Sequence, residues 1–184
     1  AWLYDEDRWP SGAAGGLVTC DEKYRARNLV FTTVKQGEAF SAGNCSRSNG
    51  DRSGNDTLLA CYDVVLDEDG YLESYKRIGE DEEAKGTKWY ALLNIYGPNS
   101  WHNDQSYVDT LNSDAIKRFI EVTHERYKES VGYEFDKTVP AIFTDEPQFT
   151  RKDTFDNSFD TEDVTMPWTD KVPELYRETY GADI

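Results

Sequence analysis

The chain has 184 residues and a formal net charge of −16, with 36 acidic against 20 basic side chains. A chain of this length suits one domain with a sizeable core. Charged residues at 30% and aromatic residues at 14% are typical of a globular protein rather than a disordered one. An acidic field of this strength repels phosphate backbones and anionic lipids, so we expect neither nucleic acid nor a membrane as a partner.

Cysteine usage gives little information about the chain. Cys20, Cys45 and Cys61 are odd in number and show no CxxC spacing, and the chain has only 2 histidines. This pattern supports neither a disulfide scaffold nor a zinc site, although a single disulfide stays open. The sequence contains no signal peptide and no transmembrane run. Because the chain starts without Met inside an expected strand, we expect a piece of a longer polypeptide, either cytoplasmic or secreted.

The first half of the chain predicts strands and loops. Residues 1–4 and 27–34 are strand candidates, and residues 37–56, rich in Gly, Ser and Asn, predict a long surface loop. Residues 58–66 and 71–78 flank Asp67-Glu68-Asp69-Gly70, which is a strong β-hairpin signal. Residues 88–96 predict a further strand. The middle of the chain is therefore expected to be an antiparallel β region.

The pattern changes to α/β after Tyr96. Residues 113–131 predict a helix with one apolar face, capped by Asn112 or Ser113 and stopped by Gly132. Residues 139–143 predict a buried strand, and residues 174–180 a last helix ending at Gly181. Strand, helix and strand in this order indicate a βαβ unit, which requires a parallel sheet.

Acidic and polar residues follow three of the expected strands. Asp5 and Glu6 follow the first strand, residues 94–103 follow the strand that begins at Lys88, and Asp145 and Glu146 follow the strand of residues 139–143. If these strands are parallel, their carboxyl ends meet on one face. Paired acids, amides and aromatic platforms are what glycoside recognition and cleavage require, because one acid protonates the leaving oxygen and another acts as base or nucleophile.

Simpler explanations of the same residues stay open. Strand ends that face water are commonly acidic, and tryptophans such as Trp9 and Trp101 more often pack in cores than bind sugars. Asp145 and Glu146 are sequence neighbours, so on an extended strand their side chains point to opposite faces. The pair is therefore not expected to serve as acid and base of one reaction.

Several segments resemble a known enzyme family when taken in order. They are residues 2–12 with 14–16, residues 107–112, residues 143–147, and residues 167–170 followed by 175–176 and 180–181. In this order they resemble segments of bacterial glycoside hydrolases, namely the α-L-rhamnosidase-like family 106 and its uncharacterised relatives. Residues 36–86 carry no segment that resembles this family.

The resemblance implies an α/β fold, a partial (β/α)8 TIM barrel with an inserted antiparallel β region. Residues 1–35 would supply the first barrel strand, residues 36–87 the insertion, and residues 88–184 the βαβ units with the catalytic strand end. Glu146 would be the general acid of a glycosidase and Asp145 would support it. The residues expected to bind the carbohydrate substrate are Asp5, Glu6, Trp9, Trp101, Asn103, Tyr107 and Asp109.

The resemblance also implies partners outside the chain. The second catalytic carboxylate would come from a later strand beyond Ile184, so the remainder of the barrel domain would be a partner. The family is associated with calcium, but no ligand residues are assigned to it. Two alternatives are a non-catalytic carbohydrate-binding domain and an acidic calcium-binding module.

Overall fold

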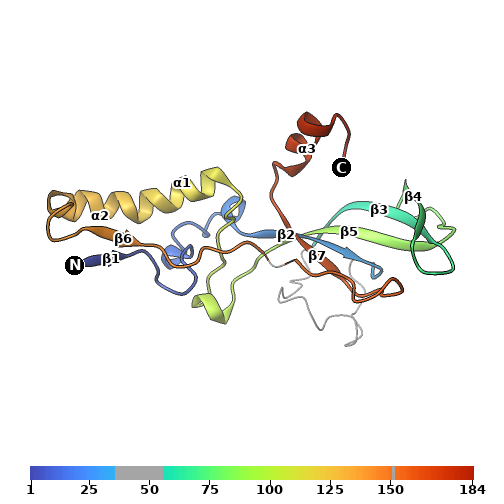
Figure 1. Ribbon diagram of the computed structural model, residues 1–184, viewed down its shortest axis with the longest axis horizontal. Coiled ribbons are helices and arrows are strands. Elements are labelled where there is room, and N and C mark those ends of the chain that lie inside the picture. Colours follow the sequence, from blue (N-terminus) through green and yellow to red (C-terminus); the bar gives the residue numbers. More distant parts are fainter. Residues whose placement is uncertain (36–55, 151) are drawn as a thin grey trace. The chain divides into compact units, whose positions relative to one another are not determined.

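The computed structural model describes residues 1–35, 56–150 and 152–184. Within them the chain divides into two compact units (Figure 1). The first unit comprises Ala1–Ala26, Tyr96–Phe149 and Trp168–Ile184, and the second comprises Arg27–Ile95 and Thr150–Pro167. Except for Asp56, the loop expected over residues 37–56 lies outside the described residues.

The first unit is built on a two-stranded parallel sheet. Strand β1 (Trp2–Tyr4) pairs with β6 (Ala141–Phe143), so that Trp2 lies opposite Ala141 and Tyr4 opposite Phe143. The strand expected over residues 139–143 is therefore shorter than predicted. It is also less buried, because one face of so small a sheet stays open within this unit: Phe143 is 42% exposed and Tyr4 42%.

Two helices separate β1 from β6 along this unit. They are α1 (Ser113–Val122) and α2 (His124–Val131), where the sequence predicted a single helix. The break falls at Thr123, whose Oγ1 donates to the carbonyl of Phe119 at 2.6 Å, a back-bond that often bends helices. Of the two predicted candidates, Asn112 and not Ser113 is the N-cap of α1, because the Asn112 side chain accepts from the amides of Asp114 and Ala115.

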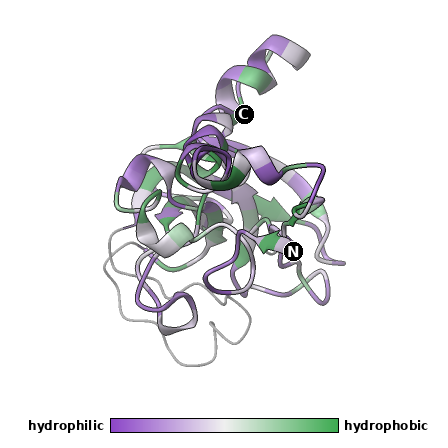
Figure 2. Ribbon diagram, turned by 90° about the vertical axis from the view of Figure 1, so that its left-hand side faces the viewer, coloured by the Kyte–Doolittle hydropathy of each residue, from purple (hydrophilic) through white to green (hydrophobic). Residues whose placement is uncertain are grey.

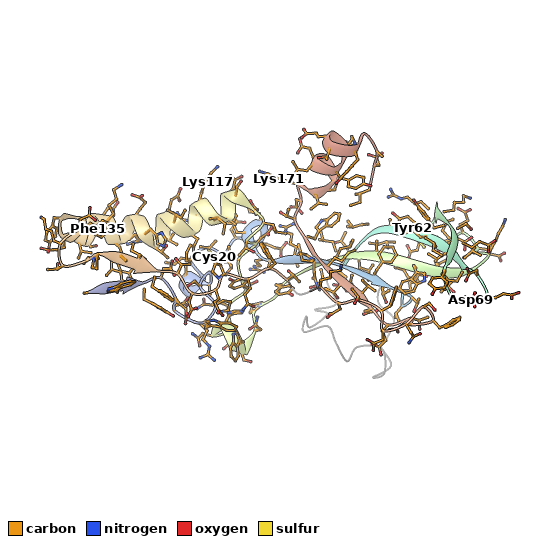
Figure 3. All side chains as sticks on the ribbon, viewed as in Figure 1. Cys20, Tyr62, Asp69, Lys117, Phe135 and Lys171 are labelled. Carbon is orange, nitrogen blue, oxygen red and sulfur yellow. The ribbon has the colours of Figure 1, made fainter. Side chains whose placement is uncertain are left out.

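The helix α1 has the buried face that its sequence pattern predicted. Its buried residues are Ala115 and Phe119, which join Val18, Ala26, Tyr107 and Val108 in one core. Charged side chains such as Lys117 project from the outer face (Figure 3). Hydrophilic and hydrophobic segments accordingly alternate along the helical ribbons (Figure 2). The unit is completed by α3 (Val172–Tyr180), ended by Gly181 in a left-handed conformation, and by 3₁₀ turns at Ala14–Gly16, Glu22–Tyr24, Ser100–His102 and Gly132–Glu134.

The second unit is a five-stranded sheet with the strand order β4-β3-β5-β2-β7. Its strands are β2 (Arg27–Thr32), β3 (Thr57–Leu66), β4 (Leu72–Ile78), β5 (Thr87–Ile95) and β7 (Val164–Trp168). The pairs β2–β5, β3–β5 and β3–β4 are antiparallel. The predicted hairpin is confirmed: Asp67 Oδ1 accepts from the amides of Asp69 and Tyr71, and Gly70 has φ +81°.

The longer segment of the second unit, Arg27–Ile95, is its main segment. The two ends of this segment lie beside each other in the sheet. Arg27, the first residue of β2, lies opposite Ile95, the last residue of β5. Directly outside this pair, within the first unit, the amide of Tyr96 donates to the carbonyl of Ala26 at 2.9 Å. The two chain positions of the first unit that flank this segment are therefore hydrogen-bonded to each other.

The expected α/β class with a partial (β/α)8 TIM barrel is wrong for the described residues, which form a mainly β structure of one two-stranded and one five-stranded sheet. The error lies in the strand of residues 88–96. We expected it to run parallel to residues 139–143, but β5 pairs antiparallel with β2 on one edge and with β3 on the other. Both edges of β5 are thereby occupied, and β6 pairs with β1 instead.

Candidate functional site

The carboxyl ends of β1 and β6 bring two of the three expected acidic segments together. Because the strands are parallel and in register, the residues that follow them lie side by side. The amide of Asp5 donates to the carbonyl of Phe143 at 3.2 Å, and the amide of Ser11 donates to the carbonyl of Asp145 at 2.9 Å. The third segment, residues 94–103, follows an antiparallel strand and does not share this edge.

The side chains gathered at these two strand ends form what we call the strand-end cluster: Tyr4, Asp5, Glu6, Ser11, His124, Thr144 and Asp145. Asp5 is its buried centre. Its side chain is 0% exposed. One carboxylate oxygen, Oδ1, accepts from Ser11 Oγ at 2.7 Å, and the other, Oδ2, accepts from Thr144 Oγ1 at 2.7 Å. His124 Nε2 also lies 2.7 Å from Oδ2. The carboxylate of Asp5 is thus engaged by three side chains of the same unit, and it ties β1, β6 and α2 together.

Three of these contacts come from residues that sequence reasoning did not select. Ser11 and Thr144 lie inside the resembling segments without an expected role, and His124 lies inside the expected helix of residues 113–131. His124 is 119 positions from Asp5 in the chain. No local sequence pattern predicts such a contact, because the contact depends on how α2 packs beside β1.

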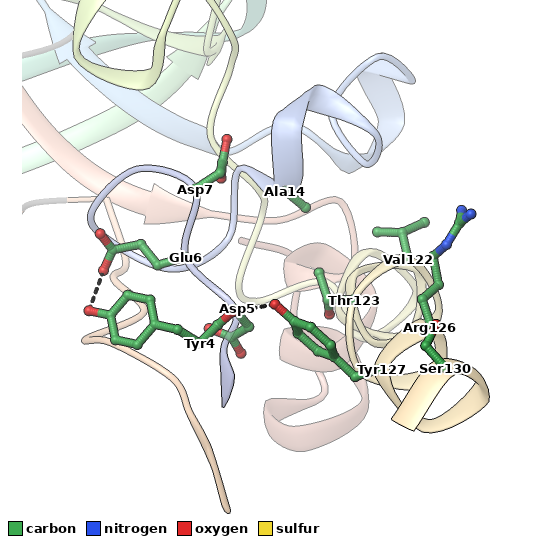
Figure 4. Close-up of a pocket in the computed structure, with 10 residues that line it drawn as sticks. All are labelled: Tyr4, Asp5, Glu6, Asp7, Ala14, Val122, Thr123, Arg126, Tyr127 and Ser130. Carbon is green, nitrogen blue, oxygen red and sulfur yellow. Dashed lines mark hydrogen bonds between the residues drawn. The ribbon is translucent and has the colours of Figure 1, made fainter. Parts of the chain in front are cut away.

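The hydroxyl of Tyr4 joins two carboxyl groups. It lies 2.6 Å from Asp145 Oδ2. It also lies 2.9 Å from Glu6 Oε2 (Figure 4). The hydrogen bond to Asp145 raises the pKa of the Tyr4 hydroxyl well above its ordinary range, and desolvation and the bond to Glu6 add to this. Tyr4 therefore keeps its proton near neutral pH. A phenol has a single proton, so the two carboxyl groups share one donor.

Glu146 differs from its neighbour Asp145. The backbone of Asp145 is clamped, since its amide donates to Ser11 Oγ at 2.8 Å in addition to the carbonyl contact of Ser11. Glu146 is exposed, and its carboxylate has no hydrogen bond or ion pair with any residue in the described part of the chain. Its φ is +41°. A non-glycine residue in this region costs about 1–3 kcal/mol, and such strain clusters at functional sites.

The two tryptophans expected to bind sugar lie against each other. The rings of Trp9 and Trp101 meet edge to face, with centroids 6.1 Å apart, and Trp101 Nε1 donates to the carbonyl of Trp9 at 2.8 Å. The guanidinium of Arg8 lies 5.0 Å from the Trp101 ring. Trp101 is 53% exposed. Asn103, also exposed, follows in a left-handed conformation with φ +55°.

Tyr107 and Asp109 are placed as supports of the fold. Both are buried. The Tyr107 hydroxyl donates to the carbonyl of Ser11 at 2.7 Å, and burial raises its pKa. Asp109 accepts from the amide of Leu111 at 3.0 Å and from Thr169 Oγ1 at 2.9 Å. These contacts bind the loop of residues 107–112 to the segments around it.

An open pocket lies between the segment that follows β1 and helix α2. It has a volume of about 360 Å³ and includes Tyr4, Glu6, Asp7, Val122, Arg126 and Ser130 in its lining (Figure 4). The volume is within the range of small-molecule sites. All of its lining residues belong to the first unit. This pocket and the strand-end cluster share Tyr4, Asp5 and Glu6.

The described residues do not offer a metal centre. In residues 1–35, 56–150 and 152–184, no group of three or more His, Cys, Asp or Glu side chains could hold a metal ion. No helix of the same residues is long and apolar enough to cross a membrane.

Comparison with known proteins finds no similar family, protein or structure. No protein-family model, no curated protein and no solved structure matches the chain. The function is therefore argued from the site itself.

Proposed function

We propose that the chain belongs to a glycoside hydrolase, with Glu146 as the general acid and α-L-rhamnosides among its candidate substrates. One observation carries the proposal. Glu146 is an exposed carboxyl group without a partner in the described residues, held on strained backbone directly beside the clamped Asp145. A general acid needs this kind of access to a substrate oxygen.

In the proposed reaction, the Glu146 carboxyl group donates its proton to the glycosidic oxygen while the bond from that oxygen to the sugar breaks. A second carboxylate then acts on the oxocarbenium-like centre as nucleophile or base. Asp5 is buried, and both Glu6 and Asp145 are engaged by Tyr4. We propose, as the resemblance implies, that the second carboxylate comes from outside residues 1–184. Asp145 and Ser11 position the Glu146 peptide.

The test uses the complete gene product that contains this chain. Glu146→Gln should lower the turnover of aryl α-L-rhamnoside or another aryl glycoside at least about a hundredfold. Binding of the sugar should change no more than a few-fold. The control is Glu129→Gln, which neutralises an exposed carboxylate on α2. Unchanged turnover of the Glu146 variant would contradict the proposal.

The second candidate is a non-catalytic carbohydrate-binding domain, favoured by the exposed ring of Trp101 beside Trp9. An aromatic side chain with a polar handle can stack on a sugar and hydrogen-bond to its hydroxyls. This candidate predicts binding that is lost in Trp101→Ala, together with no turnover in the wild type. Turnover that depends on Glu146 rules it out.

A further inference from the structure

The pocket beside α2 has two chemically different sides. Glu6 and Asp7 come from the segment after β1, whereas Arg126 and Ser130 come from α2. Figure 4 shows Glu6 and Arg126 on opposite sides of the residues drawn. Tyr4, on the side of Glu6, and Val122, on the side of Arg126, add aromatic and aliphatic surface (Figure 4). A ligand that fills this pocket therefore meets acceptors on one side and a cation on the other.

Arg126 is unusual among the arginines of this chain. Within residues 1–35, 56–150 and 152–184, it is the one arginine without a hydrogen bond, an ion pair or a ring contact. The others bind backbone carbonyls, carboxylates or rings: Arg8 contacts Trp101, Arg25 contacts Thr19, Arg77 contacts Leu59, Arg118 contacts Glu121, Arg177 contacts Asp183, and Arg27 is also engaged. In a chain with 36 acidic residues, intramolecular partners for a guanidinium are plentiful. Arg126, which is exposed, instead lines a pocket without a protein partner among the described residues.

The acidic side of the pocket also keeps acceptors available. Glu6 Oε2 lies near the hydroxyl of Tyr4, and Asp7 Oδ2 accepts from the amide of Gly15 at 2.9 Å. Each carboxylate therefore has a second oxygen for a ligand hydroxyl. These two negative charges repel a dianionic ligand group more strongly than a monoanionic one. A guanidinium in turn binds a planar carboxylate through two parallel hydrogen bonds.

We propose that this pocket binds a sugar that carries a carboxylate, that is, a uronic acid residue. The carboxylate lies against Arg126, and the ring hydroxyls donate to Glu6 and Asp7. The inference rests on the proposed function, because it names a second class of sugar, beside the candidate rhamnoside, that the first unit recognises in the substrate. It adds Arg126 as the residue that determines specificity for the acid group.

The test compares matched ligands that differ only at the sixth carbon. Methyl glucuronide and methyl glucoside, and the corresponding galacturonide and galactoside, are titrated against the full chain by calorimetry. At least one uronide should bind about tenfold or more tightly than its neutral counterpart, as expected for one charge-assisted contact. Added salt should weaken the binding of the uronide alone.

The matched variants are Arg126→Gln and Arg118→Gln. Arg118 lies on α1 and is paired with Glu121 at 3.0 Å, so its substitution removes the same charge away from the pocket. Arg126→Gln should remove the preference for the uronide, and Arg118→Gln should retain it. Equal affinity for acid and neutral sugars in the wild type, or a preference that survives in Arg126→Gln, would overturn the inference. Tighter binding of glucose 6-phosphate than of either uronide would overturn the carboxylate assignment.

Turnover of the same variants, measured in the complete gene product, separates this inference from the proposed function. If Glu146→Gln abolishes turnover but no acid preference exists, only the pocket inference fails. If turnover does not depend on Glu146 but the uronide preference depends on Arg126, the catalytic proposal fails and the binding site stands.

Discussion

The hydroxyl of Tyr4 lies 2.6 Å from Oδ2 of Asp145, which is 141 positions away in the chain. The two parallel strands of the first unit are thus joined by a side-chain bond at their carboxyl ends as well as by their backbone ladder. The same hydroxyl reaches Glu6 at 2.9 Å. Tyr4 therefore contacts acidic groups from both strand ends through a single hydroxyl.

The hydroxyl of Tyr4 should ionise only at strongly alkaline pH. Its pKa is raised in the folded protein, so the stability it contributes is complete below about pH 10, the ordinary tyrosine value, and is lost as pH rises toward the folded pKa. Absorbance titration at the tyrosinate band should show a late component in the wild type that is absent in Tyr4→Phe. If Tyr4→Phe instead loses a tyrosinate component that titrates near pH 10, the assignment is contradicted.

Asp5 should be essential for the stability of the first unit. Asp5→Asn removes one of the acceptor oxygens used by Ser11, Thr144 and His124, and places an amide donor among donors. We expect a loss of about 3 kcal/mol in the free energy of unfolding, measured by urea denaturation. The control Asp104→Asn, at an exposed position with φ +59° that asparagine tolerates, should change it little.

The strain at Glu146 should be separable from its chemistry. Glycine adopts φ +41° without a Cβ penalty, so Glu146→Gly should keep or raise the free energy of unfolding, by up to about 1 kcal/mol. Glu146→Gln retains the strain and should leave stability unchanged. Both variants should lose turnover. A marked loss of stability in Glu146→Gly would show that the backbone at this position is not strained.

His102 should make the first unit sensitive to mild acid. It is buried, its ring stacks on Tyr107 at 5.1 Å, and its Nδ1 has no hydrogen-bond partner within the described residues. Burial lowers its pKa below the ordinary value of about 6.5. The neutral form of His102 therefore stabilises the fold above about pH 6.5, the ordinary histidine pKa. This contribution is lost as the pH falls from there toward the lowered pKa of the folded protein. His102→Phe should show a smaller drop in melting temperature between pH 7 and pH 5 than the wild type.

Gly86 should be irreplaceable in the second unit. A Cβ at this position would lie 2.1 Å from the carbonyl oxygen of Val64, so Gly86→Ala forces the β3–β5 ladder to shift. Gly97 offers the matched control, because a Cβ there would meet nothing within 4 Å. Gly86→Ala should lower the melting temperature clearly, whereas Gly97→Ala should leave it nearly unchanged. Equal effects of the two variants would contradict the steric explanation.

The features that sequence predicted well are local ones. The turn at Asp67–Gly70 and the cap at Asn112 depend on residues a few positions apart, and both are found as expected. The pairing of β5 depends on competition between distant strands. Nothing in residues 88–96 indicates that β2 and β3 occupy both of its edges, and the barrel prediction failed for this reason.

The candidate site shows the same division. The acidic ends of β1 and β6 were predicted to meet, and they do, because a single parallel pairing suffices. The roles of Ser11 and His124 depend on contacts with Asp5 across the fold, which no spacing in the sequence encodes. Asp109 was expected to face a substrate, yet its carboxylate is held by Thr169, 60 positions further along.

The closure of the inserted segment at Arg27 and Ile95 has a consequence for how the chain can fold. Joining distant chain positions costs entropy that grows with the length of the intervening loop. Once β2 and β5 pair, Ala26 and Tyr96 are already neighbours, so the first unit bears almost none of that entropic cost. For the first unit, the main segment of the second therefore costs little more entropy than a short connection between Ala26 and Tyr96. The length of this segment can change without loosening the strand ends that hold the acidic groups.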